Sequence, residues 1–277
     1  MKSKVISIVA GVLLLFCLQR GIEAQNPAER EASGNPSTQA PAPSLTTTFV
    51  SDQARRIEFA INQRLRTLAN VVCHEQIARY AKRGSTTNQM DTLDVNVEVQ
   101  GGIEKYSEIR RREKLYSGME KLPGTWSVGE MATLLSATRD AIESGGVQVG
   151  QSETPDLGQT SVMTFRYAAE SRRWYLRAHS EVHWLAFEGR VWASPETGEI
   201  RRISWLADNL PAGSGATQVL WTVDFGPVDL SPTVLTLPEK ALFEITYRDG
   251  RDRMDWNVTR FSEYKRFGSE SAIHFDE

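Results

Sequence analysis

Apolar and polar residues alternate along most of the chain between Ser161 and Asp276, and this period of two predicts a series of strands. From 174 to 186 the alternation is long and regular, which predicts one long strand with an apolar and a polar face. Pro195–Gly198 and Asp249–Gly250 separate later runs and are typical of hairpin turns. The alternating apolar residues are Trp174, Leu176, Ala178, Val182, Trp184, Ala186, Val219, Trp221, Val223, Phe225, Phe243, Ile245 and Tyr247.

The same pattern begins earlier in the chain. Residues 71–81 are rich in β-branched side chains, and after an expected loop at 84–88 the residues from 93 to 100 alternate strictly. Gly101–Gly102 is a turn signal, so residues 103–114 should return antiparallel to that strand. We expect about nine to eleven strands in total, and a sheet of that size tends to curl.

Two segments have the period of a helix instead. Residues 51–69 place Ile57, Ile61, Leu65 and Leu68 on one face. Residues 127–144 begin with Ser127-Val128-Gly129-Glu130, which has the form of a capping box. The apolar stripe that follows consists of Met131, Leu134, Leu135, Thr138 and Ile142. The predicted fold class is therefore α+β: a curled antiparallel sheet, or incomplete β-barrel, with two helices packed on or across it, in a single domain at 49–277.

The N-terminal residues 1–24 have the features of a signal peptide. Lys2 and Lys4 precede the apolar stretch Val5–Leu18, and Ala24 supplies a cleavage site. Residues 25–48 are rich in Pro, Ala, Ser and Thr and are expected to be a disordered tail. The chain should therefore be exported, with the periplasm as its expected location.

Two alternatives keep the protein on a membrane. An uncleaved N-terminal segment would tether the domain, and Cys17 would allow attachment as a lipoprotein. The bulky Phe16 argues against the lipoprotein, because the peptidase needs a small residue before the cysteine. After cleavage at Ala24, Cys73 is the one remaining cysteine, so no internal disulfide is expected.

The charge balance argues against a nucleic-acid partner. The whole chain has a net charge of -3, and removal of residues 1–24 leaves 29 basic and 34 acidic residues. The one dense basic cluster, Arg110–Arg112, is more typical of a solvated face than of a phosphate site.

The sequence offers no catalytic residue, metal site or cofactor motif that we would assign. Cys73 and His74 are neighbours on a predicted strand and point to opposite faces, so they cannot form a nucleophile–base pair. His179 and His183 would be roughly 13 Å apart on one extended strand, too far for one metal ion. Phosphate-binding, dinucleotide and hydrolase motifs are missing. The protein is expected not to be an enzyme.

The aromatic content of the sheet suggests a binding surface. A sheet of this size has more concave face than two helices cover, and an uncovered apolar concavity suits a hydrophobic ligand. The alternative interpretation is ordinary core packing beneath the helices. The residues expected to line such a cavity are Trp174, Leu176, Val182, Trp184, Val219, Trp221, Val223 and Phe225.

Three stretches carry a resemblance to a known superfamily: Gly189–Ile200, Val223–Val228 and Phe261–Phe267. With the order of helices and strands, they resemble the periplasmic lipoprotein-carrier superfamily (LolA, LolB and RseB type) over about residues 50 to 276. The resemblance implies an incomplete barrel closed by helices, whose inner face binds acyl chains or a protein segment that bears them. It implies no catalytic residue.

The leading functional hypothesis is a non-enzymatic periplasmic binding protein that holds a lipid, a lipoprotein or another hydrophobic ligand. Its expected partners are a hydrophobic ligand or lipidated protein and, in addition, a membrane-associated protein. The alternatives are a cell-envelope sensor or protein-interaction module, and a hydrolase with an unrecognised site.

Overall fold

The computed structural model describes residues 6–9, 52–100, 102–144, 146–172, 174–178, 181–248 and 252–266. Eleven strands of this described part form one large antiparallel sheet. In chain order they are β2 (Asn70–Arg83), β3 (Thr86–Gln100), β4 (Ile103–Arg111), β5 (Lys114–Tyr116), β6 (Gln148–Thr154), β7 (Gly158–Tyr167), β10 (Phe187–Ala193), β11 (Ile200–Ala207), β12 (Ala216–Leu230), β13 (Thr233–Tyr247) and β14 (Arg253–Arg266).

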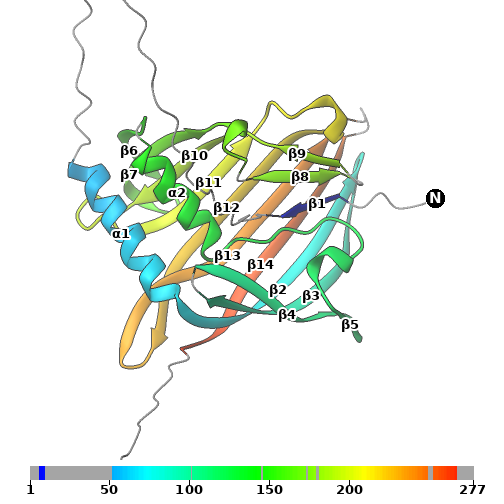
Figure 1. Cartoon of the computed structure of the whole chain (residues 1–277), viewed down its shortest axis with the longest axis horizontal. Helices are drawn as coiled ribbons and strands as arrows, with labels where there is room; N and C mark the ends of the chain where they lie inside the picture. Colours follow the sequence, from blue (N-terminus) through cyan, green and yellow to red (C-terminus); the bar gives the residue numbers. More distant parts are fainter. Residues whose placement is uncertain are drawn as a thin grey trace, which may run out of the picture. The chain divides into compact units, whose positions relative to one another are not determined.

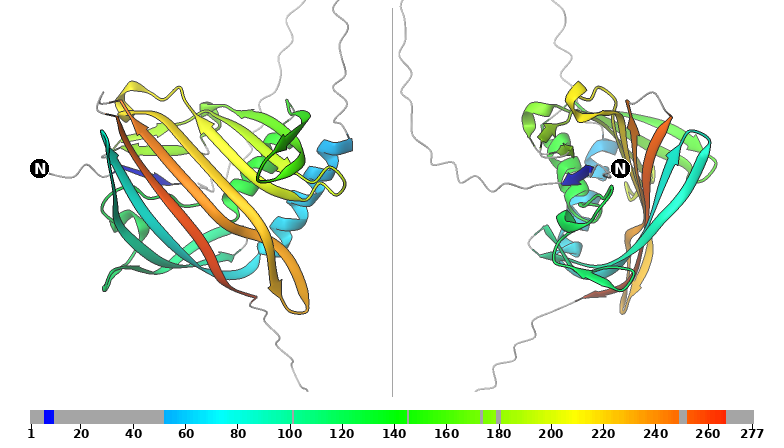
Figure 2. Two further views of the ribbon diagram at one scale, coloured as in Figure 1. Left: turned by 180° about the vertical axis from the view of Figure 1, so that it is seen from behind. Right: turned by 90° about the vertical axis from the view of Figure 1, so that its right-hand side faces the viewer.

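The sheet is curved and does not close into a barrel (Figures 1 and 2). Its strand order is β5-β4-β3-β2-β14-β13-β12-β11-β10-β7-β6, so β2 and β14 are neighbours although they lie near opposite ends of the chain. The predicted α+β class with a curled antiparallel sheet is confirmed.

Alternation fixes which face of each strand is buried. On β3, Leu93, Val95, Val97 and Val99 are fully buried, and the residues between them are half-buried. Side chains on a strand point alternately to the two faces, so this pattern places one face of the sheet against the interior. Strand β12, next to the middle of the sheet, buries Val219, Trp221 and Val223 in the same way.

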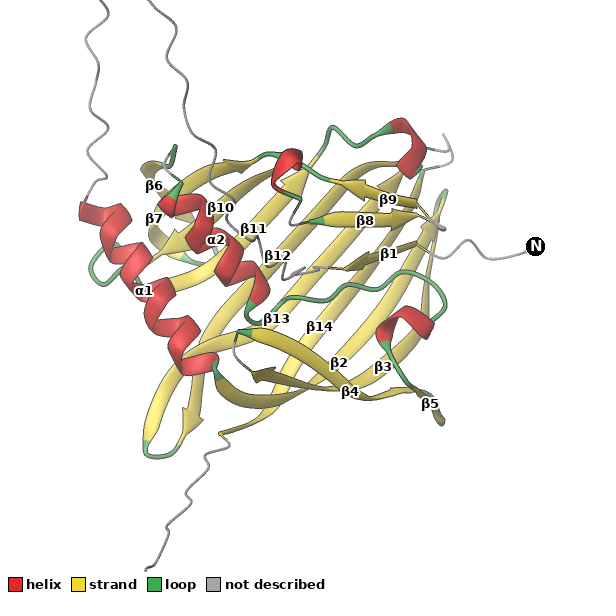
Figure 3. Cartoon of the chain, in the orientation of Figure 1, coloured by secondary structure: helices red, strands yellow, loops and turns green. Residues whose placement is uncertain are grey.

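The helices α1 (Asp52–Leu68) and α2 (Thr133–Glu143) lie together on the concave face of the sheet (Figures 2 and 3). Ile57, Ile61 and Leu68 of α1 are fully buried, as their spacing predicts. Three short 3₁₀ helices occur in the connections: η1 (Met119–Lys121), η2 (Ala169–Ser171) and η3 (Ala212–Ser214).

The turn at Pro195–Gly198 fixes the position of α1. Gly198 has a φ of +74°, as expected for glycine in this hairpin. A Cβ at Gly198 would lie 2.6 Å from the backbone carbon of Arg56, so only glycine permits this close approach to the helix. Gln53 at the start of α1 donates a hydrogen bond to the carbonyl of Ser194 at 3.2 Å.

A second, smaller sheet lies on the same face as the helices (Figures 1 and 2). It contains β1 (Ile6–Val9), β8 (Tyr175–Ala178) and β9 (Glu181–Trp184), in the order β1-β8-β9. The prediction of one long strand over 174–186 is wrong, because β8 and β9 form a hairpin in which Tyr175 pairs with Trp184. Paired residues share a face, so Trp184 lies on the side of Tyr175 and not on that of Leu176.

One further local prediction is corrected. The expected loop at 84–88 is shorter, because Thr86 already pairs with Arg83 and opens β3. Strands β6 and β7 form a hairpin around Pro155. Strand β12 continues through Pro227, with a shift of register between Asp224 and Phe225.

Several predictions concern residues outside the described part. They are the tail at 25–48, the cleavage site at Ala24, Cys17, His179 and the Asp249–Gly250 turn.

Candidate functional site

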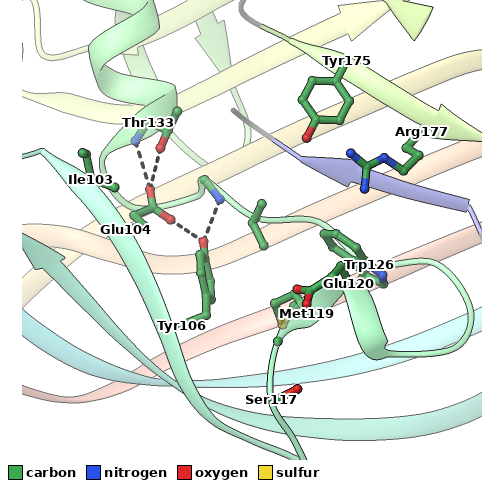
Figure 4. A pocket seen from close by; sticks show the side chains of 13 residues that line it. Ile103, Glu104, Tyr106, Ser117, Met119, Glu120, Trp126, Thr133, Tyr175 and Arg177 are labelled. Atoms are coloured by element: carbon green, nitrogen blue, oxygen red, sulfur yellow. Dashed lines mark hydrogen bonds between the residues drawn. The ribbon is translucent and has the colours of Figure 1, made fainter. Parts of the chain in front are cut away.

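A pocket of about 630 Å³ opens between β4, the segment before α2 and strand β8 (Figure 4). Its volume is in the range of small-molecule sites. Apolar and polar side chains are mixed in its wall, which suits a ligand with both kinds of surface. The wall consists of Ile103, Glu104, Tyr106, Ser117, Gly118, Met119, Glu120, Trp126, Val128, Gly129, Thr133, Tyr175 and Arg177.

One side of the pocket is a hydrogen-bonded cluster around Glu104. One Glu104 oxygen accepts from the backbone N–H groups of Ala132 and Thr133, at 2.7 and 2.9 Å. The other oxygen accepts from the hydroxyl of Tyr106, which in turn accepts from the N–H of Gly129 at 2.7 Å (Figure 4). The carboxylate thus occupies the N-terminus of α2, where a negative charge is favourable.

This arrangement replaces the predicted capping box. The helix begins at Thr133 and not near Ser127, and the Ser127 hydroxyl donates to the Glu130 side chain at 2.6 Å. Glu104, from a distant strand, accepts from the backbone N–H groups of Ala132 and Thr133 at the start of the helix. The predicted capping box of Ser127 and Glu130 is therefore wrong, because this tertiary contact takes the place of local capping.

The opposite side of the pocket is formed by β8. Figure 4 shows Tyr175 and Arg177 across the pocket from Glu104, Tyr106 and Thr133. The Arg177 guanidinium lies 5.7 Å from the centre of the Tyr175 ring, and no carboxylate of the described residues forms an ion pair with it. Arg177 therefore offers free N–H donors to an oxygen-bearing ligand.

Trp126 provides a second free donor. Its side chain is almost completely buried in the pocket wall, and its Nε1–H has no hydrogen-bond acceptor in the described part of the chain. An unpaired buried donor is costly unless a water molecule or a ligand accepts from it.

Two buried carboxyl groups lie near the Glu104 cluster. Burial, together with the charges of Glu130 and Glu104, holds the pKa of Glu75 well above its usual value. Burial, followed by the charge of Glu104, raises the pKa of Glu130 to about 8. Burial thus favours the protonated form of both groups, and Glu130, with a pKa of about 8, is mostly protonated at neutral pH.

We expect the Glu130→Gln substitution to flatten the pH dependence of stability. The folded chain keeps the Glu130 proton up to about pH 8, whereas the unfolded chain releases it near the ordinary pKa of 4.5. The raised pKa of Glu130 therefore stabilises the folded chain fully below pH 4.5. This stabilisation is lost as the pH rises to about 8, by at most about 1.4 kcal/mol of unfolding free energy per pH unit. Glutamine has no proton to lose, so the variant should gain stability relative to the native chain as the pH rises.

Urea unfolding at several pH values between about 5 and about 8 would measure this slope. The control is Glu120→Gln, since the Glu120 side chain is exposed at the same pocket, and its slope should equal that of the native chain. A Glu130→Gln chain with the native slope would contradict the assignment.

The residues predicted to line a cavity are divided between two environments. Trp174, Leu176, Val219, Trp221, Val223 and Phe225 are buried in the interior, whereas Trp184 is half-buried and Val182 is 41% exposed. The interior rings pack closely: the Trp174 ring centre lies 5.1 Å from those of both Trp205 and Trp221. None of the eight is in the wall of the 630 Å³ pocket, and their role in ligand binding stays a prediction.

Sequence reasoning missed the pocket residues for identifiable reasons. Tyr175 and Arg177 were assigned to the polar face of a strand, which concealed that this face looks into a pocket. Trp126 lies in an irregular segment, and Glu104 and Tyr106 are on the interior face of β4, opposite Val99 and Val97 of β3. The available signal was the aromatic residue and the arginine at alternate positions, Tyr175 and Arg177.

The structure was compared with solved structures. It is similar to a LolA superfamily protein from Nitrosomonas europaea, at 9% sequence identity and a TM-score of 0.38, over 81% of this chain and 97% of that one. It is also similar to a DUF1329 family protein from Desulfovibrio piger, at 7% identity and a TM-score of 0.39, over 82% of this chain and 98% of that one.

The first of these structures is described as a member of the superfamily that the sequence resembles, and the similarity concerns the fold alone. At TM-scores of 0.38 and 0.39, neither match decides what this chain binds. Comparison of the sequence with family models and with curated proteins finds no match.

The other candidate residues have structural surroundings. Cys73 is buried with its sulfur 3.3 Å from that of Met131, and burial raises the pKa of its thiol. His74 lies on the other face of β2, 3.4 Å from Asp94, so the two do not form a dyad. In the basic cluster, Arg111 binds Asp91 at 2.5 Å.

Two searches of the described residues gave no result. No group of three or more His, Cys, Asp or Glu residues is arranged to hold a metal ion. None of the helices found there has the length and apolar character needed to cross a membrane.

Proposed function

We propose that this chain is a non-enzymatic binding protein that holds a lipid or another amphiphile in the 630 Å³ pocket. The observation that carries the proposal is the combination of apolar wall and unpaired donors. Ile103, Met119 and Val128 offer apolar surface, while Arg177 and Trp126 offer N–H groups that have no acceptor among the described residues. A molecule with an alkyl chain and a carboxylate or phosphate head satisfies both.

The interior residues predicted from the sequence form a second part of the proposal. A long alkyl chain that passes the pocket would reach the cluster of Trp174 and Trp221, where its entry requires displacement of packed rings. The proposal includes export to the periplasm, where lipids and lipidated proteins are the expected partners.

The proposal predicts that Ile103→Asp weakens ligand binding. Ile103 is 43% exposed, so the change should leave the fold intact while it places a negative charge in the apolar wall. The carboxylate would have to be desolvated by an alkyl chain, which should reduce affinity about tenfold or more. A fluorescent fatty acid, titrated into protein recovered from the exported fraction without detergent, would measure this.

The matched control is Val234→Asp. Val234 is also a β-branched residue with a large exposed fraction, but it lies on β13 outside the pocket wall. The Val234→Asp chain should bind the fatty acid with the affinity of the native chain. If the native chain carries no lipid by mass spectrometry and takes up no fatty acid, the proposal is wrong. If the Ile103→Asp chain binds the fatty acid as tightly as the native chain, the ligand does not bind in this pocket.

A further inference from the structure

The edge of β8 carries a strand from the far N-terminus. β1 pairs antiparallel with β8 in a continuous register, with Ser7 opposite Arg177 and Val9 opposite Tyr175. On its other edge β8 pairs with β9, and among the described strands no other pairs with it. Figure 4 shows the ribbon of β1 passing beside the side chains of Tyr175 and Arg177.

The direction of the β8 backbone groups follows from one hydrogen bond. The N–H of Leu185 donates to the carbonyl of Trp174 at 3.0 Å, so the backbone groups of residue 174 face the β9 side. Successive residues of a strand direct their N–H and C=O groups to alternate sides. Leu176 therefore also faces β9, and the backbone groups of Tyr175 and Arg177 face β1.

Removal of the expected signal peptide would uncover this edge. β1 lies within residues 1–24, so cleavage after Ala24 takes it away. The N–H and C=O groups of Tyr175 and Arg177 are then unpaired at the wall of the pocket, where both side chains already lie. An exposed strand edge of this kind pairs readily with another extended chain.

We infer that in the exported protein the edge of β8 is a strand-addition site for an extended apolar segment of a partner polypeptide. Strand addition takes its affinity from main-chain hydrogen bonds and its selectivity from side-chain contacts. The chain's own segment Ile6–Val9, with three apolar residues and one serine, has the composition that the site accepts. This peptide site goes beyond the binding of an amphiphile, since it uses backbone groups of β8 and not its side chains.

The test compares two substitutions at one residue. Arg177→Pro removes the N–H that faces β1, at an edge position where proline leaves the β8–β9 ladder intact. Arg177→Ala removes the same side chain but keeps the N–H. The probe is a fluorescent peptide with the sequence Val5–Val12, flanked by lysines, added to exported protein whose cleavage after Ala24 is confirmed by mass.

We expect the peptide to bind the native chain and the Arg177→Ala chain alike, and to bind the Arg177→Pro chain about tenfold more weakly. Equal loss in both variants, or no binding to the native chain, would overturn the inference. If Arg177→Pro unfolds, the pair Tyr175→Pro and Tyr175→Ala applies the same comparison at the other outward-facing residue.

The fatty acid titration keeps this result separate from the pocket proposal. A chain that binds the peptide but no fatty acid would retain the strand-addition site and lose the proposed amphiphile function. A chain that binds the fatty acid but not the peptide would keep the proposed amphiphile function and exclude the strand-addition site.

Discussion

Replacement of Trp174 by alanine should lower the free energy of unfolding by about 3–5 kcal/mol. The Trp174 side chain is 1% exposed and packs edge-on to Trp221, with an interplanar angle of 85°, and also against Phe187. Because no described residue accepts a hydrogen bond from its Nε1–H, the loss comes from packing and from the cavity left behind. Trp174 also holds the β8–β9 hairpin against the sheet, so the variant should loosen this hairpin.

Urea unfolding monitored by circular dichroism would measure this change in the free energy of unfolding. The urea concentration at the midpoint should fall, while the dependence of the free energy on urea concentration stays constant. Trp192→Ala is the matched control, because Trp192 is half-buried on the other face of β10. This variant should lose less than half as much unfolding free energy as the Trp174→Ala chain. Equal losses for Trp174 and Trp192 would show that the interior cluster is not close-packed. A gain of fatty acid affinity in the Trp174→Ala chain would place the ligand in the interior.

Replacement of Arg79 by alanine should cost about 3–5 kcal/mol, because it breaks a buried ion pair. The Arg79 guanidinium binds both oxygens of Asp91, at 2.6 and 2.7 Å, and donates to the carbonyls of Pro123 and Thr125. Its loss leaves the Asp91 carboxylate with Arg111 alone and leaves two carbonyls without this donor.

The segment held by Arg79 continues into the pocket wall at Trp126, so amide exchange there should rise in the Arg79→Ala chain. Arg83→Ala is the control, since the Arg83 side chain is 45% exposed and its ion pair with Asp255 contributes at most about 1 kcal/mol. The double substitution Arg79→Ala with Asp91→Ala should recover part of the loss, because no buried carboxylate is then left without Arg79, and Arg111, which also loses Asp91, is 30% exposed to solvent. A double variant as unstable as the sum of both single ones would contradict this reason.

Alternation of apolar residues was sufficient to predict the large sheet. Residues 93–99 and 219–225 each bury the apolar parity that the sequence indicates. The stripe of α1 was equally clear, because each of its apolar positions faces the same side of one helix. In these elements the local pattern and the tertiary burial agree, so the fold class followed from the sequence.

The site could not be predicted in the same way, because distant contacts determine it. The sequence between Ala178 and Glu181 has no glycine or proline, so the alternation concealed a hairpin and the change of face at Trp184. The start of α2 depends on Glu104, which is 28 residues from Ala132 along the chain. The pocket then lies where these two unpredicted features meet.

The neighbouring positions of β2 and β14 have a consequence for how the chain acquires its structure. β2 to β5 make up one block of the large sheet, and β6, β7 and β10 to β13 make up the other. Among the described strands β14 alone joins the two blocks, and it is the last of them in the chain. Contacts between such distant segments make folding slow. Until β14 pairs, the long edges of β2 and β13 are both open, so the chain exposes two strand edges to chaperones and proteases before this late strand is in place.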